Sequence, residues 1–197
     1  MALNDLTSPI ALIETRRSGK PRDMIAPGPD AAQIHRMLAA AMRVPDHGKI
    51  APWRFVVIEA GQRDALATLL TSAYGAEKPD AGRLELESLE QFAKQSPSLI
   101  IVLSCPVEGS KIPLWEQQLS AGAACTTMLH AAHALGFVGS WLTGWPAYSD
   151  AVRDQFGGPK DQIAGFLFFG SPGRLLEERP RPEFDAIVSR WDGQFRG

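Results

Sequence analysis

Two short basic segments in the N-terminal part of the chain carry the side chains best suited to hold an anion. The first, "RRSGK" at residues 16–20, offers Arg16, Arg17 and Lys20 as charge and Ser18 as a hydroxyl donor. Arginine binds phosphate with a rigid planar fork and lysine as a point charge, so this combination suits a phosphate monoester. The helix dipole alone also favours basic residues where a helix ends, and the spacing leaves both interpretations open.

The second basic segment is "AMRVPDHGKIAPWRFVVIE" at residues 41–59, which contains Arg43 and His47. A connection between a helix and a strand needs turn residues, but it does not need these cationic side chains. The cationic side chains of Arg43 and His47 therefore favour a second site of contact with an anion. The alternative is a solvated loop in which Asp46 caps the turn through its own backbone and Trp53 belongs to the core.

Motifs of several common enzyme classes are absent. No GxGxxG follows a strand, and no P-loop, HExxH or GxSxG occurs. The two cysteines, Cys105 and Cys125, form no CxxC and have no zinc-ligand spacing, so no metal site is predicted. They are typical of buried thiols in a reducing compartment.

Histidine and serine give little support for hydrolase chemistry. His130 and His133 lie on one face of a long apolar helix, where satisfied core or interface histidines are the common case. A hydrolase that uses Ser140 or Ser171 with a histidine remains a remote alternative, because "GSPG" at residues 170–173 lacks the spacing of a serine elbow.

Length and composition indicate one ordinary globular domain over residues 1–197. The chain has 45% hydrophobic residues and a formal net charge of −2, so nucleic acid is not an expected partner. No apolar run approaches the roughly 20 residues that a membrane span needs. The N-terminus lacks the basic-then-apolar order of a secretion signal, which predicts a cytoplasmic protein with no membrane partner.

Periodicity predicts the elements that must position these residues. Helical patterns occur at 9–16, 29–43, 62–74, 80–95, 113–136 and 148–157, and strand patterns at 53–59, 98–104, 137–143 and 163–170. Strands separated by helices indicate a three-layer α+β or α/β domain. The tail at 177–197 has little to bury against, and we expect it to pack on another subunit.

Four motifs in order resemble the nitroreductase family of FMN-dependent oxidoreductases. "IETRRSGK" is similar to the family's Arg-x-Ser motif, and "PDHGKIAPWRF" to its second segment. "LWEQQLSAGAACTTMLHAAHALGFVGSWLTG" resembles the long central helix and following strand, and "IAGFLFFGSPG" the closing strand. The particular residues of these motifs resemble the small, single-domain branch of NAD(P)H nitroreductases. This implies an α/β/α fold of class α+β with a mixed, mostly antiparallel sheet.

The resemblance also implies site residues, carried over position by position. The implied FMN contacts are Arg16, Arg17, Ser18, Lys20, Arg43, His47, Trp141, Leu142, Thr143 and, as a weaker candidate, Arg174. The implied nicotinamide contacts are Ala131, Ala132, His133, Ala134, Leu135 and Gly136. The resemblance implies a polar side chain at the position of Leu142, so we expect any contact there to come from the backbone.

The implied activity is hydride transfer from NAD(P)H through bound FMN to nitroaromatic, quinone or similar electrophilic acceptors, in a ping-pong sequence. The flavin does the chemistry, so no catalytic side chain is expected. The implied assembly is a homodimer with FMN at the subunit interface. The alternative is a flavin-binding or flavin-modifying protein of the same fold without nitroreductase turnover.

Overall fold

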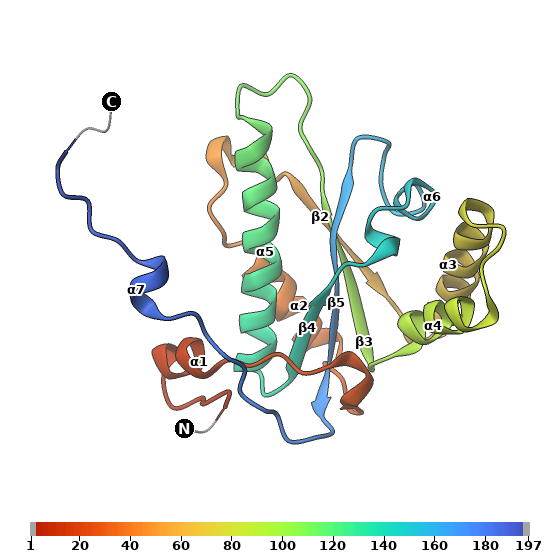
Figure 1. Cartoon of the computed structure of the whole chain (residues 1–197), viewed down its shortest axis with the longest axis horizontal. Helices are drawn as coiled ribbons and strands as arrows, with labels where there is room; N and C mark the ends of the chain where they lie inside the picture. The colour runs from red at the N-terminus through yellow and green to blue at the C-terminus, as the bar shows by residue number, and fades with distance from the viewer. Residues whose placement is uncertain (1–2, 195–197) are drawn as a thin grey trace.

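The centre of the molecule is a five-stranded sheet with helices on both faces (Figure 1). The computed structural model describes residues 3–194. The strands are β1 (Met24–Ile25), β2 (Trp53–Ile58), β3 (Ser98–Ser104), β4 (Val138–Leu142) and β5 (Gln162–Pro172). The α-helices are α1 (Pro9–Thr15), α2 (Ala31–Ala41), α3 (Arg63–Glu77), α4 (Arg83–Lys94), α5 (Leu114–Ala134), α6 (Asp150–Arg153) and α7 (Phe184–Ile187). Short 3-10 turns are η1 (Pro21–Asp23), η2 (His47–Lys49), η3 (Ala60–Gln62) and η4 (Trp145–Ala147).

Strand β5 organises the sheet because it pairs with three other strands. β3 lies along one edge of β5, and β4 and β1 share the other edge. β2 closes the far side of β3. The α+β class with helices on both faces is confirmed. Every recorded pairing in the described part of the chain is antiparallel, so the sheet there is antiparallel rather than mixed.

The two central strands bury both faces, which gives two separate cores. Successive side chains of a strand point to opposite faces, so a continuous apolar run serves both. The face toward α2 and α5 takes Ile100, Val102, Leu167 and Phe169. The face toward α3 and α4 takes Leu99, Ile101, Leu103, Phe166 and Phe168. Each side chain buried in this way contributes about 1.5–3 kcal/mol to stability.

Helix α5 is the longest element and lies across one face of the sheet (Figure 1). One face of its second half is buried, with Cys125 and Met128 fully enclosed. Its first turns are different, since Trp115 and Leu119 are 67% and 52% exposed. The sequence predicted a helix buried in the core or in an interface. The core position is confirmed for the second half of α5, and an interface at its exposed first turns stays a prediction.

The predicted helix boundaries agree with the structure at α1 and differ from it at α2. Helix α1 begins as expected, because the Ser8 hydroxyl accepts from Ala11 N at 3.1 Å and Pro9 takes the first helical position. Helix α2 ends at Ala41 rather than at Arg43. Pro45 disfavours helical geometry only for Val44, so it limits the helix but does not explain why α2 ends before Arg43.

Two further elements were predicted poorly. The helix expected at 148–157 is much shorter in the structure, where α6 is a single turn. Gly157 and Gly158 follow a few residues later. Strand β1 was missed, since two residues carry no periodic signal and depend on pairing with the end of β5. After β5 the chain leaves the body as an exposed tail that contains α7 (Figure 1). No helix among residues 3–194 is long and apolar enough to cross a bilayer.

Candidate functional site

The first basic segment emerges directly from the end of α1. Arg16 leaves helical geometry with φ −59° and ψ 125° and ends the helix. Arg16 Nη1 donates to Ser18 Oγ at 3.0 Å, and Arg17 Nη1 donates to the Ser18 carbonyl at 3.0 Å. Asn4 holds the backbone, because its side chain accepts from Arg17 N at 2.8 Å and donates to Arg17 O at 3.3 Å. The two guanidinium groups and the hydroxyl are thus brought together.

His133 ties this segment to the last turn of α5. Its Nδ1 lies 2.7 Å from Leu129 O and its Nε2 lies 3.2 Å from Arg17 O. The side chain is 1% exposed, and burial lowers its pKa, so the ring is neutral near pH 7. A neutral imidazole has one N–H and donates to one of these carbonyls at a time. The side chain therefore acts as a structural link between α5 and Arg17.

The charge on Arg16 is not compensated by the protein. Burial, followed by the nearby charges of Arg181 and Arg17, lowers the pKa of the half-buried Arg16. Within residues 3–194, neither Arg16 nor Arg17 forms an ion pair with a carboxylate. Half-buried cations without a carboxylate partner favour binding of an external anion.

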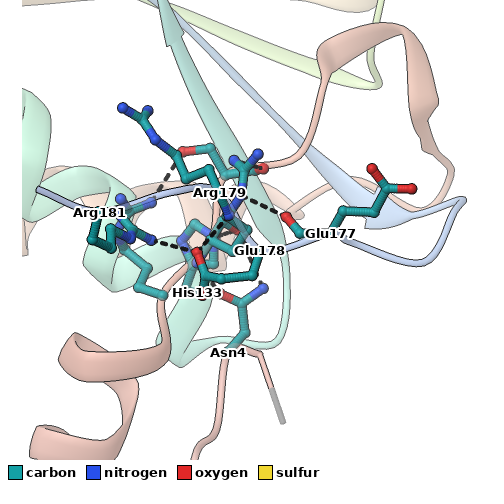
Figure 2. A network of polar contacts seen from close by, with 9 residues as sticks. Asn4, His133, Glu177, Glu178, Arg179 and Arg181 are labelled. Carbon is teal, nitrogen blue, oxygen red and sulfur yellow. Dashed lines mark hydrogen bonds and ion pairs between the residues drawn. The ribbon is translucent and has the colours of Figure 1, made fainter. Parts of the chain in front are cut away.

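The start of the tail crosses this cationic segment. Arg17 Nε donates to the Glu177 carbonyl at 2.8 Å, a contact between residues 160 positions apart. Figure 2 shows Glu177, Glu178, Arg179 and Arg181 gathered with Asn4 and His133. Sequence reasoning missed this arrangement, since the only signal was an alternation of acids and arginines in the tail.

Lys20 and Arg174 lie at the margin of this group. Lys20 is exposed and directly precedes η1. Arg174 is paired with Asp23, at 3.5 Å between Nε and Oδ1, and remains 77% exposed. Whether either side chain reaches a phosphate stays a prediction.

The second basic segment is held at the opposite end of α5. The Asp46 carboxylate accepts from Ile50 N at 3.2 Å and Ala51 N at 2.8 Å. It therefore organises its own loop, as one interpretation of the sequence proposed. Gly48 has φ 76°, a conformation that favours glycine, which explains its place in this turn.

Side chains from α5 hold this loop in place. Ser120 Oγ accepts from Trp53 Nε1 at 3.1 Å and donates to Pro45 O at 2.8 Å. His47 Nδ1 lies 2.7 Å from Glu116 Oε2, in an exposed pair. Arg43 is exposed. These contacts lie on the first two turns of α5, whereas the Arg17 contact lies on its last turn.

A single chain keeps the two basic segments apart. At a rise of 1.5 Å per residue, the positions of Glu116 and His133 on α5 are about 25 Å apart along the helix. The loop before β2 lies beside one end of α5, and α1 lies beside the other end (Figure 1). One phosphate cannot contact both segments of the same chain.

The end of β4 contributes the third group of candidates. Trp141 Nε1 donates to Ala164 O at 2.9 Å, and its indole covers Gly165, where a Cβ would lie 2.0 Å from Nε1. Leu142 packs against the core toward α3, and Thr143 is half-buried. Trp141 is 37% exposed, so it can present an aromatic surface to a ligand.

The stretch predicted to meet nicotinamide forms the end of α5 and the turn to β4. Ala132 and His133 are buried, whereas Ala134 and Gly136 are exposed and Ala131 and Leu135 lie between these extremes. His133 and Gly136 line an open cavity of about 1030 Å³, together with Phe137, Arg174 and Glu178. The cavity lies between the N-terminal segment, this turn and the tail. The nicotinamide assignment stays a prediction.

Comparison with known proteins places the chain in a family. A model of the Nitroreductase family matches residues 13–171. The chain belongs to the nitroreductase family. It is 37% identical over 174 residues to a Haemophilus influenzae protein named "Putative NAD(P)H nitroreductase", covering 87% of this chain and 92% of that protein. It is 36% identical over 164 residues to an Escherichia coli K12 protein named "Putative NAD(P)H nitroreductase YdjA", covering 83% and 87%.

Solved structures confirm the nitroreductase fold. A nitroreductase-like family protein from Bacillus cereus has a TM-score of 0.82 at 19% identity, covering 98% of this chain and all of that one (100%). A nitroreductase with bound FMN from Bacteroides fragilis has a TM-score of 0.69 at 17% identity, covering 93% and 100%. At these identities the likeness concerns the fold alone.

The nitroreductase shows no nucleophile activated by a histidine in its described residues. Burial raises the pKa of Cys125 to about 12, and burial with the Asp161 charge raises that of Cys105 to about 11. Both thiols are free. Ser171 donates to a backbone carbonyl, and within residues 3–194 neither Ser171 nor Ser140 is hydrogen-bonded to a histidine. The geometry gives the hydrolase alternative no support.

Proposed function

We propose that this nitroreductase binds FMN and uses NAD(P)H to reduce nitroaromatic compounds, quinones or similar electrophilic acceptors in a ping-pong sequence. The proposal rests above all on the pair of arginines at residues 16 and 17, which stand beside Ser18 without a carboxylate partner among the described residues. Family membership and the named relatives agree with it. FMN supplies the redox chemistry, accepting hydride from one substrate and passing it to another.

The residues present fit the phosphate end of FMN. A phosphate monoester carries about two negative charges at neutral pH and three acceptor oxygens. Arg16 uses one of its five N–H donors on Ser18 Oγ, which leaves donors for a phosphate. Desolvation of Arg16 strengthens its attraction for an anion, because charges interact more strongly away from bulk water.

The protein's own side chains bind and orient in this proposal. Arg16 and Arg17 hold the phosphate, and the exposed indole face of Trp141 offers an apolar surface for a flat ring. Backbone N–H groups of Leu142 and Thr143 are the proposed donors to the ring edge. The proposed reaction needs no side chain that holds or transfers a proton. This agrees with the structural roles of Asp46 and His133.

A second copy of the chain would complete the site. In a two-fold symmetric dimer each surface meets itself, so two α5 helices packed antiparallel would bring the start of one near the end of the other. Trp115 and Leu119 on α5, and Ile10 and Ile13 on α1, are exposed apolar residues available for such a contact. Arg43 and His47 of one subunit would then approach the phosphate site of the other.

The tail at 177–197 is proposed to take part in this assembly. Glu177 is hydrogen-bonded to Arg17 in the body of the protein, whereas the following part carries exposed Phe184, Ile187 and Trp191. Apolar side chains at 70%, 67% and 75% exposure favour burial against another surface. Residues 195–197 of the predicted extension lie outside the described residues.

The deciding experiment is reduction of bound flavin. Protein saturated with FMN is mixed anaerobically with NADH or NADPH while absorbance of oxidised flavin is followed, and a nitroaromatic or quinone is then added. We expect bleaching by the reduced nicotinamide and recovery on adding the acceptor. Flavin that binds and stays oxidised would favour the alternative, a flavin-binding or flavin-modifying protein. Protein that takes up no FMN would refute both.

Subunit complementation tests the shared site. Arg16→Gln and Arg43→Gln proteins are each expected to bind FMN weakly, because every site in either homodimer carries a change. Co-expressed, they form mixed dimers in which one site carries both changes and the other carries neither. Recovery of about a quarter of the wild-type sites supports the shared arrangement. Without such recovery, each subunit must hold its flavin alone.

A further inference from the structure

We propose that Glu116, on the first turn of α5, is a positioning residue for flavin binding. Its carboxylate holds the His47 imidazole in one orientation and leaves the ring nitrogen Nε2 for a flavin bound across the subunit interface. The inference rests on the function proposed above and deepens it, because it adds a residue that acts only through His47. Glu116 itself does not touch the flavin in this arrangement.

The contact between His47 and Glu116 decides which ring nitrogen is available. His47 Nδ1 lies 2.7 Å from Glu116 Oε2. A carboxylate offers only acceptor oxygens, so Nδ1 must carry a proton to make this hydrogen bond. Among residues 3–194, Nε2 of His47 has no hydrogen-bond partner. Nε2 is therefore the nitrogen left for a ligand, as an acceptor in the neutral ring and as a donor in the charged ring.

The backbone that follows His47 has an uncommon conformation. Gly48, Lys49 and Ala51 all have positive φ, at 76°, 56° and 47°. Glycine adopts such angles readily, whereas a residue with a side chain keeps them only where surrounding contacts hold it there. Backbone strain of this kind occurs often at ligand sites, where it belongs to a pre-organised geometry. The turn thus has the character of a ligand loop rather than of a flexible connection.

The first two turns of α5 hold the backbone of this loop. The buried Gln117 side chain donates to Ile112 O at 2.9 Å, which fixes the segment just before α5. Ile112 in turn lies against the loop, since a Cβ added at Gly48 would be 3.3 Å from Ile112 Cγ1. Ser120 is hydrogen-bonded to both ends of the loop. With the backbone held by Gln117 and Ser120, the contact left to Glu116 is the one that orients the imidazole.

Two simpler explanations exist for the position of Glu116. The side chains of His47 and Glu116 are 64% and 43% exposed, and an exposed ion pair stabilises a fold only slightly. The dipole of α5 also favours an acidic residue in the first turn of the helix. Neither explanation makes Glu116 favourable for FMN affinity. On electrostatic grounds alone, removal of a carboxylate strengthens binding of an anion such as FMN. Weaker binding on removal of Glu116 is therefore the specific sign of a positioning role.

The test is a double-mutant cycle on FMN affinity in the full chain. Dissociation constants are measured by fluorescence titration for wild type, Glu116→Ala, His47→Ala and the double variant. We expect each single substitution to weaken FMN binding about threefold to tenfold, as for the loss of one hydrogen bond. The double variant should bind no more weakly than His47→Ala. The matched control is Glu90→Ala, an exposed glutamate of α4 on the other face of the sheet, and it should bind as wild type does.

Nitrogen NMR spectra of isotope-labelled histidine give a second readout, which a purely structural role would leave unchanged. In the flavin-free wild type we expect the His47 ring to be protonated at Nδ1. In Glu116→Ala the neutral ring should become a mixture of the two tautomers. The His47→Ala protein assigns the signals, and thermal unfolding checks that each variant keeps its fold.

Each result either supports or overturns the proposal. FMN affinity that Glu116→Ala leaves unchanged or tightens overturns it, and so does normal binding by His47→Ala. Losses that add in the double variant show that Glu116 does not act through His47. Weaker binding with unchanged imidazole signals assigns Glu116 a structural role instead. A wild-type protein that takes up no FMN refutes the proposed function itself, and the inference with it.

Discussion

Arg16→Gln is the substitution that separates binding from folding most clearly. Glutamine retains a polar side chain that donates hydrogen bonds, but it removes the positive charge and the guanidinium that contacts Ser18 Oγ. In the flavin-free protein that charge is unfavourable, because burial and two neighbouring arginines lower the pKa of Arg16. We therefore expect the substitution to weaken FMN binding and, at the same time, to leave the flavin-free protein as stable as wild type or more stable.

The sign of each effect follows from the charge. A cation whose pKa is lower in the folded state is less favourable there than in the unfolded chain, so neutralising it near pH 7 does not reduce the free energy of unfolding. In the complex the same charge donates to the phosphate. Loss of a hydrogen bond to a charged group costs about 1.5–3 kcal/mol, which corresponds to roughly a tenfold to 150-fold rise in the dissociation constant.

Two measurements decide the outcome. Fluorescence titration gives FMN affinity, and urea unfolding without flavin gives stability, for wild type, Arg16→Gln and the control Arg36→Gln. Arg36 is an exposed arginine on α2, away from the first basic segment. The control should match wild type in both measurements. A variant that loses stability along with affinity, or that binds FMN normally, would show that Arg16 serves folding rather than the phosphate.

Three further predictions concern the scaffold. Met128→Ala, at a fully buried position between α5 and the sheet, should lower the free energy of unfolding in urea by about 2–5 kcal/mol, and a loss under 1 kcal/mol would contradict the packing. Gly165→Ala should displace the Trp141 indole, because the new Cβ would meet Nε1 at 2.0 Å; a lost or shifted indole N–H resonance in NMR spectra checks this, and an unchanged spectrum refutes it. Cys125, fully buried and with its pKa raised to about 12, should react with a disulfide reagent at pH 8 only after unfolding, whereas half-buried Cys105, with its pKa raised to about 11, should react slowly in the native protein; two thiols that react before unfolding would argue against the burial of Cys125.

Local signals explain which elements the sequence predicted well. Ser8 and Pro9 mark the start of α1 with a cap and a fixed backbone angle, and both act within four residues. Apolar runs at residues 98–104 and 163–170 are long enough to fill both faces of a sheet, so β3 and β5 were recognised. Strand β1 lacks such a run and exists through its pairing with β5, which no local pattern encodes.

The candidate site also has parts that local sequence predicts and parts that only the folded chain brings together. Arg16, Arg17 and Ser18 are adjacent in the chain, so their proximity could be predicted from their order. The separation of Arg43 from this group depends on the orientation of α5, which the sequence does not reveal. Glu177 reaches Arg17 across 160 positions, and only the folded chain brings them together.

Hydrogen bonding distinguishes the structural polar residues of this chain from those available to a ligand. His133 and Asp46 have residue types that suggest chemistry, yet their side chains are engaged with backbone groups of the protein itself. Arg16 and Arg17 are the reverse case, since they are partly removed from water and no carboxylate among the described residues lies within ion-pair distance of them. A fold maintains such an unfavourable arrangement when a ligand supplies the missing charge. The lack of internal compensation, more than the presence of arginine, is therefore what identifies the anion site.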